Sequence, residues 1–308
     1  MAPPATRSLS LSEAGVSFTL YLRAKNLADK TVHSYLESVR GFSEYLQAQG
    51  VPDDVRQITR THIRGFLLSL RERGLKASTE RVRYASLRQF FKFLLVDEEI
   101  EEDPMQGVSA PAVPNKPIEV LTDDELTRLV ATAEGSSVFA DRRDAAIIRT
   151  FYSSGARLSE VANLRVEDVD LLRGRVWFHK TKGDKPRGVG LGSKTARAID
   201  RYLRERRGHQ EAQVEWLWLG RRGRFTTVGI AQMLEARGKD AGIEKHVHPH
   251  MLRHSYAHRH LAAGGEEGDL MRLLGWSDRT MLDRYAASTA AQERALDAQK
   301  RMRLDDQL

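Results

Sequence analysis

The chain has 308 residues, of which 41% are hydrophobic and 30% are charged, a composition typical of a globular protein long enough for two domains. It contains no cysteine, which excludes disulfides and thiolate metal sites, and the sequence has neither a signal-peptide core nor a membrane-spanning apolar run. The formal net charge of +7 fits two alternatives: a polyanionic partner such as nucleic acid, or a basic protein that binds no polyanion.

The first hundred residues are predicted to be helical. Ser10 and Glu13 have the spacing of a capping box at the start of the first helix. A second helix starts at Asp29 and stops at Gly50. A third and a fourth are predicted over 61–74 and 78–99, and the fourth is expected to bury Val82, Leu87, Phe90, Phe91 and Leu94.

Three basic residues of the fourth helix, Arg81, Arg88 and Lys92, share the opposite face, because they are separated by seven and four positions. Most such stripes are solvated helix faces. A helix that contacts a DNA groove is the alternative. Both interpretations stay open at this point.

A proline-rich segment separates this region from the rest of the chain. Four of the nine prolines fall between residues 104 and 117, and proline lacks the donor N–H that a helix or an inner strand needs. The segment therefore predicts an extended linker, 104–118, between a helical domain, 1–103, and a second domain, 119–308.

The second domain is predicted to be mostly helical, with one β-hairpin. Thr122 has the position of a helix N-cap, and a glycine break at Gly155 separates a long helix from a short one. Alternating residues on both sides of a Lys-Gly-Asp-Lys turn predict the hairpin over 174–191. The fold class is therefore mainly α with a small β-hairpin or sheet (α+β).

Five histidines and two arginines occur within residues 248–260, on a helix predicted over 249–263. His250, His254 and His258 lie one turn apart, a spacing that zinc could use, but the helix holds no carboxylate and the chain no cysteine to complete a ligand set. Arg253 lies three residues after His250. A guanidinium beside an imidazole at a helix start suits phosphate chemistry, so we expect no metal here.

Four ordered motifs surround this pair. They are "GARLSE" with Arg157 and Glu160, "TKGDKPR" with Lys182, His250-x-x-Arg253, and "LLGWSDRTMLDRY" with Trp276 and Tyr285. In order and spacing they resemble the tyrosine recombinases, the family of phage integrases and Xer-type site-specific recombinases. The match covers the second domain, and the helical domain resembles the family's core-site DNA-binding domain.

The resemblance implies a role for each of seven residues. Tyr285 is the nucleophile that forms a 3′-phosphotyrosine and releases a 5′-hydroxyl. The two guanidinium groups hold the non-bridging oxygens, and Glu160 orients Arg157. Lys182 protonates the leaving oxygen, and His250 assists proton transfer. The predicted site residues are thus Arg157, Lys182, His250, Arg253, Trp276 and Tyr285, with Glu160 as support.

Two physical arguments agree with these roles. A phenol with a pKa near 10 needs a base and a positive field to attack at neutral pH. Trp276 occupies the place of a histidine in most family members, and an indole N–H donates a hydrogen bond but transfers no proton. We therefore expect Trp276 to bind and pack.

The resemblance also implies partners and an assembly. The expected partner is double-stranded DNA with a specific core site, held by two domains in a C-shaped clamp. The tail after Tyr285 would dock on a neighbouring subunit to give a homotetramer on two DNA sites. An accessory factor for direction, a cytoplasmic, nucleoid-associated location and the absence of any cofactor complete the expectation. A type IB topoisomerase-like enzyme and a catalytically inactive DNA-binding regulator are the alternatives.

Overall fold

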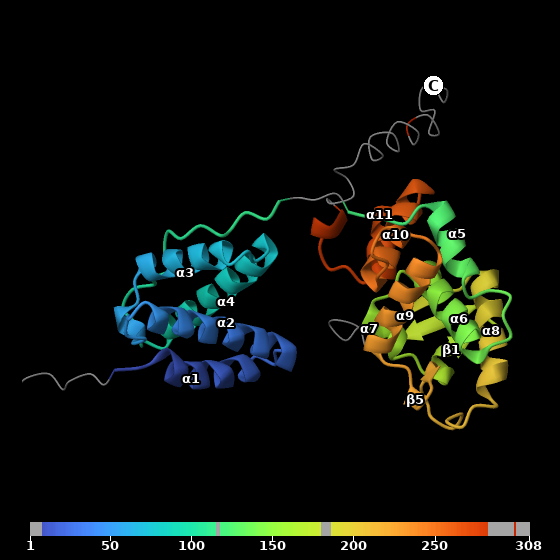
Figure 1. The fold of residues 1–308 in the computed structure, drawn as a ribbon, viewed down its shortest axis with the longest axis horizontal. Coiled ribbons are helices and arrows are strands. Elements are labelled where there is room, and N and C mark those ends of the chain that lie inside the picture. The colour runs from blue at the N-terminus through green and yellow to red at the C-terminus, as the bar shows by residue number, and fades with distance from the viewer. Residues whose placement is uncertain (1–7, 115–117, 180–185, 283–298, 300–308) are drawn as a thin grey trace, which may run out of the picture. The chain divides into compact units, whose positions relative to one another are not determined.

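The computed structural model describes residues 8–114, 118–179, 186–282 and 299, and the chain divides into two compact units, Met1–Lys116 and Pro117–Leu308 (Figure 1). The division falls inside the predicted linker. In the described parts of the chain, none of the helices has the length and hydropathy that a bilayer span requires. Each unit has its own hydrophobic core.

The N-terminal unit is built from four α-helices in its described part. Its helices are α1 (Leu11–Ala24), α2 (Asp29–Ala48), α3 (Arg60–Glu72) and α4 (Ala77–Val96), with a 3₁₀ turn at Val55–Gln57. The predicted capping box at Ser10 is present. Phenylalanines from all four helices fill the core: Phe18, Phe42, Phe66, Phe90 and Phe91 are each at most 1% exposed.

The fourth helix follows the predicted pattern except at one residue. Leu87, Phe90, Phe91 and Leu94 are buried, as expected, but Val82 is 49% exposed and the prediction for it was wrong. Position 82 lies five residues before Leu87, off the stripe of three- and four-residue steps that faces the core. Glu80 and Tyr84 take the buried positions of that turn instead.

The first part of the proline-rich segment packs on the helical unit. Met105 and Val108 are 4% and 8% exposed and belong to its core. The Tyr84 hydroxyl donates a hydrogen bond to the Val108 carbonyl oxygen at 2.9 Å. The N-terminal core thus continues past residue 103, because these two apolar side chains anchor the segment.

The C-terminal unit combines helices with two small antiparallel sheets. The helices are α5 (Asp123–Ala131), α6 (Phe139–Ser154), α7 (Leu158–Ala162), α8 (Ser193–Arg206), α9 (Thr227–Asp240), α10 (Pro249–Ala262) and α11 (Glu267–Leu274), with a 3₁₀ turn at Val166–Asp168. Thr122 caps α5 as predicted. The mainly helical α+β fold class is therefore confirmed.

The predicted hairpin is present and has a third strand. Strands β2 (Arg175–Phe178) and β3 (Arg187–Gly190) pair with Phe178 opposite Arg187, and β1 (Val169–Asp170) adds to the edge of β2. Strands β4 (Leu219–Gly220) and β5 (Gly223–Arg224) form a second, separate pair. Strand β1 and both strands of the second sheet were not predicted, because strands of two residues are too short to show an alternating pattern.

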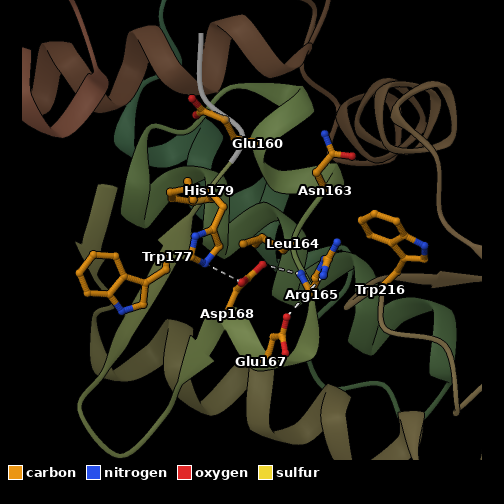
Figure 2. A pocket seen from close by; sticks show the side chains of 10 residues that line it. Glu160, Asn163, Leu164, Arg165, Glu167, Asp168, Trp177, His179 and Trp216 are labelled. Carbon is orange, nitrogen blue, oxygen red and sulfur yellow. Dashed lines mark hydrogen bonds and ion pairs between the residues drawn. The ribbon is translucent and has the colours of Figure 1, made fainter. Parts of the chain in front are cut away.

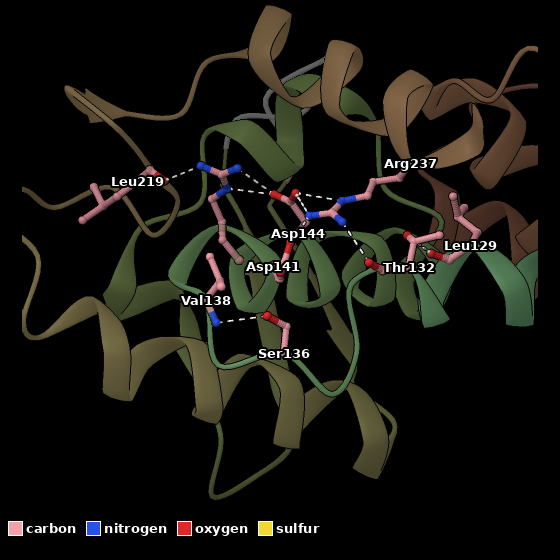
Figure 3. A network of polar contacts seen from close by, with 9 residues as sticks. Leu129, Thr132, Ser136, Val138, Asp141, Asp144, Leu219 and Arg237 are labelled. Atoms are coloured by element: carbon pink, nitrogen blue, oxygen red, sulfur yellow. Dashed lines mark hydrogen bonds and ion pairs between the residues drawn. The ribbon is translucent and has the colours of Figure 1, made fainter. Parts of the chain in front are cut away.

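A buried carboxylate joins α6, α9 and the chain at β4 (Figure 3). Asp144 is 4% exposed and accepts hydrogen bonds from Arg143 at 2.7 Å and from Arg237 at 2.7 Å. Arg143 also donates to the Leu219 carbonyl oxygen and Arg237 to the Thr132 carbonyl oxygen. The network therefore ties together segments that are far apart in the sequence.

Replacing Asp144 with alanine should destabilise the C-terminal unit by about 3–5 kcal/mol, because two poorly exposed guanidinium groups lose their shared counter-ion. Urea unfolding followed by circular dichroism measures the change. Glu235→Ala, which removes an exposed pair with Lys239 on α9, is the control and should leave the midpoint unchanged. Equal midpoints for the two variants would contradict the assignment.

Candidate active site

The site begins at the break between α6 and α7. Helix α6 ends at Gly155, whose φ of 57° lies in the left-handed region. A Cβ at this position would lie 2.5 Å from Tyr256 Cδ1 and 2.6 Å from Leu274 Cδ2, so only glycine fits here. Arg157 follows as the N-cap residue of α7. The glycine break predicted from the sequence is confirmed.

Arg253 reaches this break from α10. Its side chain is almost fully buried; Nη1 donates to the Gly155 carbonyl oxygen at 2.8 Å and Nη2 to the Leu274 carbonyl oxygen at 2.7 Å. Both of these acceptors are uncharged. They orient the guanidinium group without neutralising it.

The Arg157 side chain contacts Gly275, the residue that follows Leu274. Its Nη2 donates to the Gly275 carbonyl oxygen at 3.1 Å. Gly275 terminates α11 with a φ of 61°, and a Cβ there would come within 3.6 Å of Arg157 Nη1. The carbonyls of the adjacent residues Leu274 and Gly275 thus hold one arginine each, which brings the two predicted guanidinium groups together.

His250 and Trp276 lie beside the two arginines. Partial burial, followed by the positive charges of Arg253 and Arg157, lowers the pKa of His250 below its ordinary value of 6.5. The Trp276 ring centre is 5.7 Å from Arg253 Cζ, within cation–π range. The imidazole is therefore kept neutral near pH 7, in the field of both guanidinium groups.

Glu160 is 3% exposed and binds both the backbone and the side chain of Arg157. Its carboxylate accepts the Arg157 backbone N–H at 2.7 Å and Nη1 at 3.0 Å. A second arginine, Arg187 of β3, donates to the same carboxylate through both terminal nitrogens, at 2.6 Å each. Burial opposes ionisation of Glu160, but hydrogen bonds and charge from Arg187 and Arg157 prevail and lower its pKa.

Sequence reasoning missed Arg187. The only signal for it was its place in the quoted "TKGDKPR" motif, directly after the turn, and the pattern gave no reason to separate it from other hairpin cations. Its partner lies 27 positions away in the chain. A contact of that range follows from the fold and not from local spacing.

The remaining predicted residues lie outside the described ranges or in the other unit. Lys182, Tyr285 and the tail after it, except residue 299, lie outside the described residues. The basic side chains of α4 belong to the other unit, where all three, Arg81, Arg88 and Lys92, are exposed. Within the described ranges no group of three histidine, aspartate or glutamate side chains is arranged to bind a metal ion.

A separate cavity of about 320 Å³ lies between the end of β2 and the segment 160–168 (Figure 2). Its lining includes Trp177, His179 and Trp216, and His179 Nε2 lies 3.0 Å from Asp168 Oδ1. Of the site residues described above, only Glu160 borders it. The two arginines and His250 therefore lie outside this cavity; His250 is exposed, Arg157 is partly exposed and Arg253 is buried.

Family models match both units. The phage integrase family matches residues 119–292, and the N-terminal SAM-like domain of phage integrases matches residues 16–98. The first of these models covers more than half of the chain. This chain therefore belongs to the phage integrase family, the tyrosine-type site-specific DNA recombinases, and the prediction made from the four motifs is confirmed.

Individual proteins agree with this classification. The chain is 32% identical over 212 residues to the tyrosine recombinase XerC of Syntrophus aciditrophicus (strain SB), covering 67% of this chain and 68% of that protein. A XerH site-specific recombinase bound to a palindromic difH substrate is 21% identical, with a TM-score of 0.71 over 94% of this chain and 85% of that one. A lambda integrase tetramer bound to a Holliday junction is 17% identical, with a TM-score of 0.70 over 89% and 79%.

The pKa of His250 should rise when Arg157 is replaced with glutamine, because one of the positive charges that lower it is removed. NMR titration of the imidazole measures this, with Arg173→Gln as a control far from the histidine in sequence. Because its pKa is lowered, His250 is less protonated in the folded chain than in the unfolded chain just below pH 6.5. This group therefore lowers the free energy of unfolding as the pH falls through that range. An unchanged His250 titration in Arg157→Gln would show that the two groups are not coupled.

Proposed function

We propose that this chain cuts and rejoins double-stranded DNA at a specific core site through a covalent 3′-phosphotyrosine at Tyr285. The observation that carries the proposal is the meeting of Arg157, Arg253 and His250 around the Gly155 and Gly275 turns. Two guanidinium groups and a neutral imidazole are what a phosphodiester needs when it accepts a phenolic nucleophile.

The bond changes balance without a further reactant. His250 accepts the phenolic proton while the Tyr285 oxygen bonds to phosphorus, and the bond from phosphorus to the 5′-oxygen breaks. Lys182 donates a proton to that leaving oxygen. Arg157 and Arg253 stabilise the charge on the non-bridging oxygens. The phosphotyrosine keeps the energy of the phosphodiester, so rejoining requires neither ATP nor a metal ion.

The other predicted residues support this reaction. Trp276 packs against the Arg253 guanidinium and donates its indole N–H to a phosphate oxygen. On α4, the exposed Arg81, Arg88 and Lys92 contact the phosphate backbone next to the core site, since charges there raise affinity for any duplex. The predicted division into domains 1–103 and 119–308 assigns core-site binding to the first and catalysis to the second.

The active assembly that we propose is a homotetramer on two DNA sites. The tail after Tyr285 docks on a neighbouring subunit, a heterologous contact that closes into a ring. The lambda integrase tetramer on a Holliday junction, a structural neighbour, supports this arrangement. The protein acts in the cytoplasm at the nucleoid, and an accessory factor sets the direction of recombination.

A type IB topoisomerase-like activity shares the covalent chemistry but needs only one duplex. Its product is relaxed DNA, whereas a recombinase joins strands from two duplexes. Family membership favours recombination. Exchange between two labelled target duplexes separates the two activities, and an inactive regulator would form no covalent adduct in either assay.

Incubation with a random-sequence duplex pool should give covalent protein–DNA adducts that survive detergent, and sequencing them identifies the core site. On a nicked duplex with that site, Tyr285→Phe should form no adduct, because the nucleophile is absent. Arg253→Ala should slow adduct formation by at least about 100-fold with little loss of binding.

Tyr152→Phe and Arg259→Ala are the matched controls in the same domain, and both should retain cleavage. Adducts formed by Tyr285→Phe would overturn the nucleophile assignment. Unchanged cleavage by Arg253→Ala would show that this residue does not stabilise the scissile phosphate.

Deletion of the residues after 290 should abolish DNA-bound tetramers while leaving binding of one protomer to its site, because only the contact between subunits is lost. Native gel shifts and multi-angle light scattering measure the stoichiometry. Full-length Tyr285→Phe, which retains the tail, is the control and should assemble. Intact tetramers from the truncated chain would refute the docking role.

A further inference from the structure

Two arginines, Arg157 and Arg187, share the buried carboxylate of Glu160. Each oxygen of Glu160 accepts one hydrogen bond from Arg157 and one from Arg187. Glu160 is 3% exposed, so water screens these charges poorly. The three side chains therefore form one electrostatic unit that spans α7 and β3.

The net charge of these three side chains determines how strongly Arg157 can attract an anionic ligand. Arg157 and Glu160 alone would form a neutral pair, and a neutral pair attracts a phosphate weakly. Arg187 adds a second positive charge on the same carboxylate, so the unit keeps a net charge of +1. The bidentate contact at 2.6 Å is also shorter than the side-chain contact of Arg157 with Glu160, at 3.0 Å.

We propose that Arg187 is a positioning residue for Arg157: it occupies and neutralises Glu160, which leaves the Arg157 charge available to the scissile phosphate. This inference rests on the proposed function. Arg187 directs both of its terminal nitrogens to Glu160, at 2.6 Å each, and its Cζ lies 5.0 Å from the Phe178 ring centre. It acts through Glu160.

A second observation distinguishes this role from simple sheet packing. The Arg187 Nε is buried and has no hydrogen-bond partner among the described residues. A buried donor without a partner costs about 1–3 kcal/mol, so an arginine is a poor choice for stability alone. Departures of this kind are expected where a side chain is retained for function.

The test compares Arg187→Met and Arg187→Lys on the nicked duplex that carries the recovered core site. Arg187→Met should slow adduct formation at saturating DNA by about 10- to 100-fold, as loss of a supporting group typically does, while the DNA dissociation constant stays the same. Arg187→Lys should recover much of the rate, because it restores the charge. Arg173→Met, at an exposed turn of the same domain, should match the wild-type rate.

A duplex with a neutral methylphosphonate at the scissile position gives the decisive measurement. If Arg187 acts through the charge that Arg157 presents, the penalty of Arg187→Met should shrink strongly on this substrate, because there is less anionic charge to balance. An equal penalty on both substrates, or a loss of DNA binding, would overturn the inference in favour of a structural role. Absence of adducts with wild-type protein would instead refute the proposed function.

Discussion

The buried carboxylate of Glu160 is the contact on which the arrangement of the site depends. It joins α7 to β3, and through Arg157 it reaches the Gly275 turn at the end of α11. A buried charge of this kind is tolerated only when it is fully hydrogen-bonded. Each oxygen of Glu160 accepts two hydrogen bonds. The same carboxylate therefore holds the backbone at Arg157 and joins the side chains of two arginines.

The two central arginines are held by different means. Arg253 is oriented by neutral carbonyl oxygens, whereas Arg157 is oriented by a carboxylate whose charge needs a further cation. Both arrangements fix a guanidinium group at the turn formed by Leu274 and Gly275. Partial burial of His250 beside these two arginines favours its neutral form, so two guanidinium groups and a neutral imidazole lie in one cluster of side chains.

The sequence predicted the parts of this site that local spacing determines. Gly155, Arg157, His250 and Arg253 stand next to breaks and helix starts that can be recognised within a few residues. Arg187 and the carbonyl partners at the Gly275 turn were not predictable, because they meet the motifs only across the folded chain. The prediction that Val82 is buried was wrong for a related reason. Its apolar side chain alone does not determine whether it lies on the buried face of α4.

The glycines at 155 and 275 have a consequence for how this site can vary. Each adopts a left-handed conformation where a side chain would meet neighbouring atoms, and the carbonyl of each accepts a hydrogen bond from an arginine. The chain that leaves the Gly275 turn thus starts from an anchored point. A change in the length of the chain beyond this point would alter how far the following segment extends, while the hydrogen bonds of Arg157 and Arg253 to the turn would stay the same.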